Sequence, residues 1–222
     1  MIGSSRKEVP EHLKVDIRSI SEERANMISH GAGLLLILVG VPFLINYTFN
    51  TGILEYFFGS VMYSISLIMV YTASTLYHSS YNAKARKRLR IFDHISIYFL
   101  IAGTYSPFLL THIQTTSGVV IFIILWSMVL IGSIVKLKFV DDFKFISLMA
   151  YLVMGWLAVF IAKPLYIELP RVSFYWIVTG GLLYTFGSYF YMKKGLKYSH
   201  LIWHLFVLGG SIAHFVAVCY CI

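Results

Sequence analysis

Two histidines stand four residues apart at the start of the last apolar segment, "YSHLIWHLFVLGGSIAHF". The i,i+4 spacing puts His200 and His204 on one face of a helix, where both imidazoles can bind one cation without bending the helix. The pair alone is weak evidence, because a histidine inside a membrane more often makes a hydrogen bond between helices. Further ligands are therefore needed before a metal site is predicted.

Two other apolar segments supply such groups. "YTASTLYH" ends on His78, with Ser74 one turn away on the same helix face, and "IFDHISIY" brings in Asp93. Three neutral imidazoles, from His78, His200 and His204, would leave a fourth tetrahedral position for water, as in catalytic zinc sites. Asp93 would accept a hydrogen bond from that water or take its proton. Intramembrane ionisable residues are costly and tend to mark function, which favours a metal site. A proton relay or a buried polar network is the alternative.

The composition shows which elements must position these groups. The chain is 58% hydrophobic and 13% charged, about half the charged fraction of a soluble domain. These values and a mean hydropathy of +0.76 indicate an integral membrane protein. The net charge of +8 fits basic residues that flank membrane spans, and no nucleic-acid-binding motif accompanies it. We therefore expect membrane lipids as partners and no nucleic acid.

Seven stretches are long enough to cross a bilayer, which takes about 20 apolar residues. They predict an all-α fold, a single seven-helix transmembrane domain over 27–222, after a cytoplasmic N-terminal segment over 1–26. "SISE" offers Ser19 and Glu22 as a capping box ahead of the first span. No secretory signal precedes that span. The predicted spans are 27–49, 52–78, 91–111, 118–135, 145–162, 172–192 and 200–222.

The basic residues orient this bundle. The N-terminal tail and the loops after spans two, four and six hold 16 of the 18 lysines and arginines, and the other side holds only Lys163 and Arg171. The positive-inside rule then places the N-terminus in the cytoplasm and Ile222 outside, in a multi-pass protein of the cell membrane. In this topology His78, Asp93 and His200 all lie near the cytoplasmic edge of the hydrocarbon core. His204 lies about 6 Å deeper than His200.

For the other histidines of the spans, the sequence gives weaker evidence that they belong to the metal site. His30 is either a support for the ligands or a packing residue. His94 follows Asp93 directly and points about 100° away from it around the helix. His214 lies ten residues beyond His204, about 15 Å deeper, which is too far to share the ion.

The remaining singled-out residues have structural interpretations. His112 and Glu55 fall at the outer boundary of the membrane, where contact with water is enough to explain a polar side chain. Cys219 and Cys221 have a spacing that is poor for a metal site and strained for a disulfide, so we interpret them as small apolar residues. A kink or close helix packing is expected at Pro107, Gly180-Gly181 and Gly209-Gly210.

The motifs together resemble a known family. "EERANMISHGAG", "STLYH", "RIFDHISIYFLIAGTYSPF", the "GW" of span five and "SHLIWHLFVLGGSIAHF" occur in this order along nearly the whole chain. This pattern resembles the hemolysin III family, the bacterial branch of the progestin and adiponectin receptor superfamily. The combination of S-x-x-x-H, an aspartate at the start of span three and H-x-x-x-H in span seven is specific.

The resemblance implies a seven-helix bundle with a cytoplasmic N-terminus and a zinc ion near the cytoplasmic face. By motif, it implies that His78, His200 and His204 bind zinc, that Asp93 contacts zinc through water and that Ser74 lines the site. Similarity of the wider superfamily to the alkaline ceramidases implies hydrolysis of a lipid amide. The chain departs from the adiponectin receptors at His94, where they have a different residue.

These observations leave three functions open. The first is a zinc-dependent hydrolase of lipid-like amides or esters, in which zinc lowers the pKa of water to about 7 and polarises a carbonyl, with Asp93 as the general base. The second is a sensor or regulator of membrane lipids, in which a structural zinc joins spans two and seven. The third is a pore-forming cytolysin, which the family's name suggests. The substrate or ligand, as well as the oligomeric state, is not indicated by the sequence.

Overall fold

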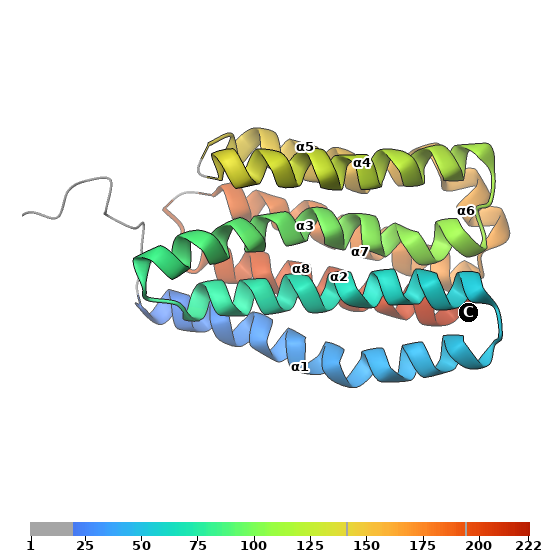
Figure 1. The fold of residues 1–222 in the computed structure, drawn as a ribbon, viewed down its shortest axis with the longest axis horizontal. Helices are drawn as coiled ribbons and strands as arrows, with labels where there is room; N and C mark the ends of the chain where they lie inside the picture. Colours follow the sequence, from blue (N-terminus) through green and yellow to red (C-terminus); the bar gives the residue numbers. More distant parts are fainter. Residues whose placement is uncertain (1–19, 141, 194) are drawn as a thin grey trace, which may run out of the picture.

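The chain forms a bundle of long helices (Figure 1). The computed structural model describes residues 20–140, 142–193 and 195–222. Ser19 of the predicted capping box and most of the predicted segment 1–26 lie outside these residues. The elements are α1 (Ile20–Asn50), α2 (Leu54–Ser79), α3 (Ala83–Thr111), α4 (Thr116–Phe139), α5 (Lys144–Trp156), the 3₁₀ helix η2 (Leu157–Ile161), α6 (Ala162–Glu168), α7 (Arg171–Met192) and α8 (Ser199–Cys221).

The prediction of an all-α, seven-helix membrane bundle is confirmed, because α5, η2 and α6 together make up the fifth span. By length and composition, α1, α2, α4, α5–α6 and α8 can each cross a membrane. The predicted bounds fall near the observed ones except at the start of the first and third spans and at the end of the fifth, where α6 continues to Glu168. At the two starts, α1 begins at Ile20 and α3 at Ala83, since a helix can continue into polar and basic residues beyond its apolar stretch.

Side chains are distributed as expected for a protein in lipid. Large apolar residues point outward, such as Phe43 at 72% and Phe160 at 78% exposure, whereas Ser60 and Ser106 are fully buried. Lipid offers no partner for a hydroxyl, so polar groups are placed between helices. The apolar exterior is therefore the surface that contacts lipid.

Small residues allow the helices to approach closely. A Cβ on Gly59 would lie 2.8 Å from the Cα of Pro107, and one on Gly210 would lie 2.9 Å from the ring of Tyr184. Gly180 similarly faces the ring of His214. The close packing predicted at Pro107, Gly180 and Gly210 is thus observed, and it joins α2 to α3 and α7 to α8. It is not observed at Gly181, where a Cβ would meet nothing within 4 Å.

The fifth span is interrupted near its middle by η2. Pro164 has no N–H with which to continue the helical hydrogen bonds back to this turn. Tyr105 of α3 compensates at the junction: its hydroxyl donates to the carbonyls of Met154 (3.2 Å) and Gly155 (2.5 Å) and accepts from the Ala158 N–H (2.8 Å). α3 therefore fixes the position of the broken span.

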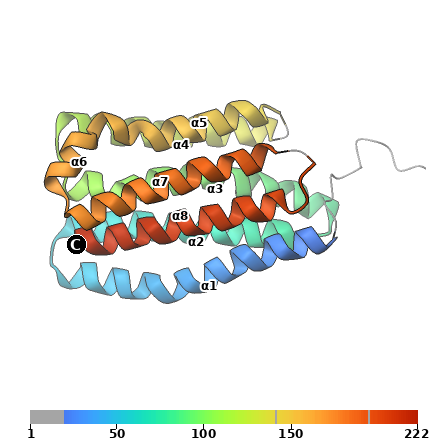
Figure 2. The same cartoon turned by 180° about the vertical axis from the view of Figure 1, so that it is seen from behind.

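The helices run side by side, and the view from behind shows α8 beside α7 (Figures 1 and 2). α8 also packs against α1 and α3, and α5 packs against α3 and α7. We call the end where α2 and α7 end and where α3 and α8 begin the basic end; it carries Arg24, Lys84, Arg86, Lys87, Arg88, Arg90, Lys136, Lys138, Lys144, Lys193 and Lys197.

Candidate metal centre

Three histidines meet near the basic end of the bundle. His78 comes from the last turn of α2, and His200 and His204 come from the first two turns of α8. Their ring centroids lie 4.6 to 5.2 Å apart. One ring nitrogen from each lies within 4.8 Å of the other two. The three histidines singled out from the sequence are therefore brought together, and they could hold a metal ion.

His78 is oriented by a buried carboxylate. Its Nδ1 lies 2.7 Å from Oε2 of Glu23, which is 1% exposed. An ionised carboxylate only accepts hydrogen bonds, so Nδ1–H is the donor and Nε2 carries the lone pair. Nε2 is buried and has no hydrogen-bond partner among the described residues. A carboxylate on the far nitrogen is the usual support of a metal-binding histidine.

Glu23 is itself neutralised by an arginine. Oε1 of Glu23 lies 2.9 Å from a guanidinium nitrogen of Arg86, which is 4% exposed. Arg86 also donates to the carbonyls of Tyr77 and Ser80, each at 3.2 Å, and stacks over the Tyr77 ring. An unpaired buried charge would be strongly destabilising. The ion pair therefore fixes the C-terminal end of α2, and with it His78, between α1 and α3.

α1 also supports His204. The Ser29 hydroxyl donates to the Asn26 carbonyl (2.8 Å), so it can only accept from Nδ1–H of His204, 3.1 Å away. Nδ1–H also lies 3.3 Å from the Asn26 carbonyl. This tautomer places the lone pair of His204 on Nε2. The ring of His30 stacks on that of His204 at a centroid distance of 3.6 Å.

The donor set fits a transition metal. Two of the three imidazoles are in the tautomer that presents Nε2 as the ligand atom, and the buried Nε2 of His78 is otherwise unsatisfied. Three imidazoles suit zinc better than magnesium or calcium, which prefer oxygen ligands. Three protein ligands also leave one tetrahedral position for water or substrate.

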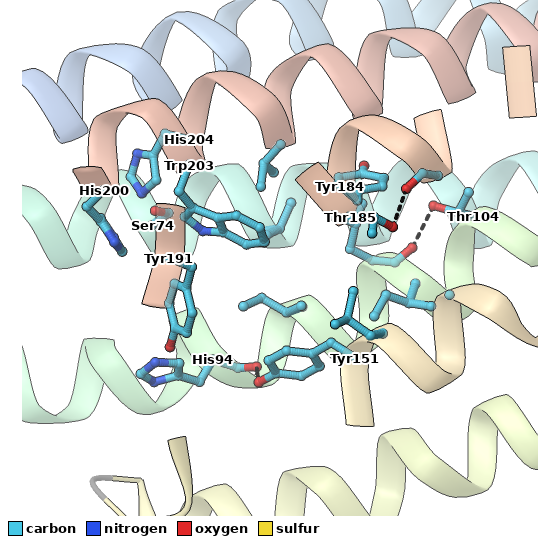
Figure 3. Close-up of a pocket in the computed structure, with 18 of the residues that line it drawn as sticks. Ser74, His94, Thr104, Tyr151, Tyr184, Thr185, Tyr191, His200, Trp203 and His204 are labelled. Atoms are coloured by element: carbon cyan, nitrogen blue, oxygen red, sulfur yellow. Dashed lines mark hydrogen bonds between the residues drawn. The ribbon is translucent and has the colours of Figure 1, made fainter. Parts of the chain in front are cut away.

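Ser74 and Asp93 lie at the same site. Ser74 is 2% exposed and lies one turn before His78 on α2, and Asp93 comes from α3. Both residues line the cavity that the three histidines line. Figure 3 shows Ser74 beside His200 and His204. The structure thus brings the five predicted site residues together, while the roles given to Ser74 and Asp93 remain predictions.

The structure also shows where the other histidines lie. His94 lines the same cavity on the α3 side (Figure 3). His214 lies deeper in that cavity, and its Nε2–H donates to the Ile177 carbonyl at 3.1 Å. His112, at the opposite end, bonds to the Cys221 carbonyl at 2.7 Å. Cys221 and Cys219 are both free thiols.

Two residues of the site, Glu23 and Arg86, were not predicted from the sequence. One signal was available for Glu23. With Asn26 and His30 it forms an i, i+3, i+7 pattern within "EERANMISH", which puts one carboxylate, one amide and one imidazole on a single helix face. Arg86 gave no such signal, since it stands in a run of basic residues that the positive-inside rule explains already.

A cavity of about 960 Å³ extends from the histidines into the bundle. Its walls come from α3, the broken fifth span, α7 and α8, and beyond the metal centre they are largely apolar, with Ile97, Leu100, Ile101, Phe108, Ile161 and Leu165 among them. On α8 the cavity is lined from His200 to His214, about 21 Å at 1.5 Å per residue. Such a volume lies near the upper limit for pockets that take a single small molecule.

Comparisons with known proteins agree with the resemblance in the motifs. Residues 18–215 match the Haemolysin-III related family. The chain is 43% identical over 205 residues to "Hemolysin-3 homolog" of Bacillus subtilis, covering 92% of this chain and 96% of that protein. It is 39% identical over 199 residues to "Hemolysin-3" of Bacillus cereus, covering 90% and 91%. The human "Monocyte to macrophage differentiation factor" is 27% identical over 164 residues, or 71% and 67% of the two chains.

Proposed function

Since the chain belongs to the Haemolysin-III related family, we propose that it is a membrane-embedded zinc hydrolase that cleaves an amide or ester of a long acyl chain. The observation that carries the proposal is the position of the three histidines, with Asp93 and Ser74, at the mouth of a deep apolar cavity. Water converts such an amide into a carboxylic acid and an amine. The chain's own residues must therefore bind the acyl group, orient water and move its proton.

The ion would be held by His78, His200 and His204, with Glu23 and Ser29 fixing the tautomers of His78 and His204. Zinc in a site of this kind polarises a carbonyl and lowers the pKa of bound water to about 7. Because His200 and His204 lie on one helix and His78 on another, small shifts of α8 against α2 would change the site. Glu23 and Arg86 oppose such shifts by tying α1, α2 and α3 together.

Asp93 is the proposed general base. Its carboxylate takes a proton from the attacking water and returns it to the leaving nitrogen or oxygen, so it is regenerated in each cycle. The Ser74 hydroxyl, which lines the same cavity, would donate a hydrogen bond to this carboxyl and orient it. A carboxylate fits this role here because Asp93, on α3, lines the same cavity as the histidines of α2 and α8.

The cavity is suited to an acyl chain. The hydrocarbon core of a bilayer is about 30 Å thick and holds two acyl chains end to end, so one chain needs about 15 Å. The cavity wall of about 21 Å along α8 exceeds this length. The apolar side chains of the walls would also limit the entry of water, which strengthens electrostatic interactions at the metal centre.

An Asp93→Asn variant tests the proposal. We expect purified Asp93→Asn to keep most of its zinc, because Asp93 acts through water, and to lose at least about a hundredfold in hydrolysis of acylated amines, the usual scale for a general base. Zinc content and turnover should be measured on the same preparation across a panel of acyl amides and esters. His200→Ala/His204→Ala serves as the metal-free reference.

A structural zinc predicts a different result. In that case wild type shows no turnover across the panel, and Asp93→Asn changes only thermal stability or a lipid-dependent response. The network that joins His78 to α1 and α3 favours this second candidate, a membrane-lipid sensor, since metal binding would lock four helices together. Lysis, which the name of the Bacillus cereus relative indicates for that protein, is tested separately by dye release from liposomes that contain the purified protein.

A further inference from the structure

We propose that the acyl chain held in this cavity carries a hydroxyl group about two-thirds of the way along the length that the cavity accommodates. This inference rests on the proposed function for the acyl chain and for its direction, with the reacting bond at the metal centre. It adds a second polar contact, deep between the helices. The ligand's chemical class is thus an acyl compound of a long-chain hydroxy acid.

Polar side chains from three helices line the cavity far from the metal centre. They are Thr104 of α3, Tyr184 and Thr185 of α7, and His214 of α8. Thr104 lies eleven residues beyond Asp93, about 16.5 Å along α3, and His214 lies about 15 Å beyond His204 along α8. Figure 3 shows Thr104, Tyr184 and Thr185 well away from His200. These groups therefore form a polar level within a largely apolar cavity.

His214 offers a hydrogen-bond acceptor at this level. The side chain is 8% exposed, and its Nε2–H donates to the Ile177 carbonyl of α7, so Nδ1 of the neutral ring carries a lone pair. A Cβ on Gly180 would lie nearest to Nε2 and Cδ2, which turns Nδ1 away from α7. Nδ1 is buried and has no hydrogen-bond partner among the described residues. Since a buried acceptor without a partner is costly, the site calls for a donor.

Thr104 presents a second acceptor. Its side chain is buried, and its hydroxyl donates to the Leu100 carbonyl at 2.7 Å (Figure 3). A hydroxyl that donates its proton in this way keeps lone pairs that can accept. Thr104 can therefore receive a hydrogen bond from a ligand, but it has no proton left to offer one.

The neighbouring hydroxyls do not supply the missing donor. The hydroxyls of Tyr184 and Ser211 lie 2.8 Å apart and bond to each other. Thr185 donates to the Gly181 carbonyl at 2.8 Å. Two acceptors on different helices, with no printed donor between them, suit a hydroxyl, because this is a neutral donor that an acyl chain can carry into an apolar cavity at modest cost.

The depth of these acceptors sets the position of the hydroxyl on the chain. On α3 the cavity continues past Thr104 to Leu109, which lies sixteen residues beyond Asp93, or about 24 Å. A chain of about eighteen carbons that fills this length from Asp93 to Leu109 would bring about carbon 12 to Thr104. The last carbons would then contact Leu165 and Phe174, which also line the cavity.

The α3 wall closer to the metal centre is apolar. After His94, the α3 residues that line the cavity before Thr104 are Ile97, Leu100 and Ile101. A hydroxyl at their level loses its contact with water and gains no side-chain partner from α3. The inference therefore predicts that the position of the hydroxyl on the chain matters, and not its presence alone.

Three fatty acids test the inference by binding alone, since a free acid cannot be hydrolysed. Octadecanoic acid is the plain chain, and its 12-hydroxy and 7-hydroxy derivatives place one hydroxyl near Thr104 or between Ile97 and Leu100. In titration calorimetry on the zinc-loaded protein in detergent, the 12-hydroxy acid should bind about fivefold more tightly than octadecanoic acid, the scale of one hydrogen bond. The 7-hydroxy acid should show no such gain.

Two substitutions remove the acceptors and preserve most of the packing. His214→Gln keeps an amide N–H where Nε2–H stood but lacks Nδ1, and Thr104→Val removes the hydroxyl at nearly constant volume. The double variant should lose the preference for the 12-hydroxy acid and keep its zinc and its affinity for octadecanoic acid. Thr104→Val alone should lose part of the preference, so the test does not depend on the folding of the double variant.

Thr111→Val is the matched control. The Thr111 hydroxyl also donates within α3, to the Pro107 carbonyl, but Thr111 does not line the cavity. This variant should keep the full preference. Partition of the acids into detergent is common to all variants, so a change in the ratio of affinities between proteins reports on the cavity. A preference that Thr104→Val and His214→Gln leave intact would overturn the inference.

The outcome is separable from that of the proposed function. Tighter binding of the 12-hydroxy acid without turnover of any amide or ester would refute the hydrolase and leave the hydroxyl site standing. Turnover together with equal affinities for octadecanoic acid and the 12-hydroxy acid would support the hydrolase and overturn the hydroxyl site, because water would then satisfy Nδ1 of His214. Absence of binding of all three acids would refute the acyl-chain cavity and this inference with it.

Discussion

At the scale of single residues, the donor set predicts the metal. Three imidazoles whose ring nitrogens lie within 4.8 Å of one another favour zinc, and we expect close to one zinc per chain after purification without chelators. His200→Ala/His204→Ala should lose the metal but still insert in the membrane, because the apolar spans drive insertion. Elemental analysis measures the zinc content and membrane fractionation measures insertion, with His112→Ala at the opposite end as control. Wild-type protein without any transition metal would refute the site.

Glu23 supplies the second test at this scale. Glu23→Gln keeps the size of the side chain but removes the charge that makes His78 a stronger ligand, so zinc affinity should fall about 10- to 100-fold. Competition with a chelator of known affinity measures the change. Glu22→Gln removes a neighbouring carboxylate that contacts Tyr198 and should leave the affinity unchanged. If both variants bind zinc as wild type does, Glu23 contributes to stability alone.

At the scale of elements, the broken fifth span depends on its neighbour α3. The Tyr105 hydroxyl bonds to backbone groups on both sides of Trp156. Tyr105→Phe removes these bonds and leaves the Ala158 N–H without this acceptor in an apolar setting. We expect a loss of about 1–2 kcal/mol in the free energy of unfolding.

Thermal unfolding in detergent would measure this loss, with the exposed Tyr175→Phe as the matched control. Zinc content should not change, because Tyr105 lies about three turns beyond Asp93 on α3. An unchanged melting temperature would show that water or lipid replaces the hydroxyl, and the junction would then be held by packing alone.

At the scale of the whole molecule, the basic residues predict which side of the membrane each loop and the C-terminus occupy. A reporter fused after Ile222 should report an external C-terminus, and one fused within 84–90 should report the cytoplasm. These fusions test the topology independently of the metal. The reverse pattern would place the histidines, together with the mouth of the cavity, at the external face, and the proposed ligand would then have to reach them from outside the cell.

The sequence by itself determined the seven spans and the residues that could bind a metal. Apolar length specifies a span directly, and i,i+4 spacing specifies that His200 and His204 share a face. Topology then placed His78 and Asp93 at the same depth. These inferences needed only distances along single helices, which have a fixed rise per residue.

Only the tertiary structure decided which helices stand beside one another. Residues at one depth can lie anywhere around a seven-helix bundle, so depth alone could not bring His78 to His200, nor reveal that Glu23 and Arg86 hold His78 in place. The cavity was likewise invisible in the sequence. It exists because α3, α7, α8 and the broken fifth span do not pack completely against one another, and spaces between helices depend on packing across the bundle rather than on any local pattern of residues.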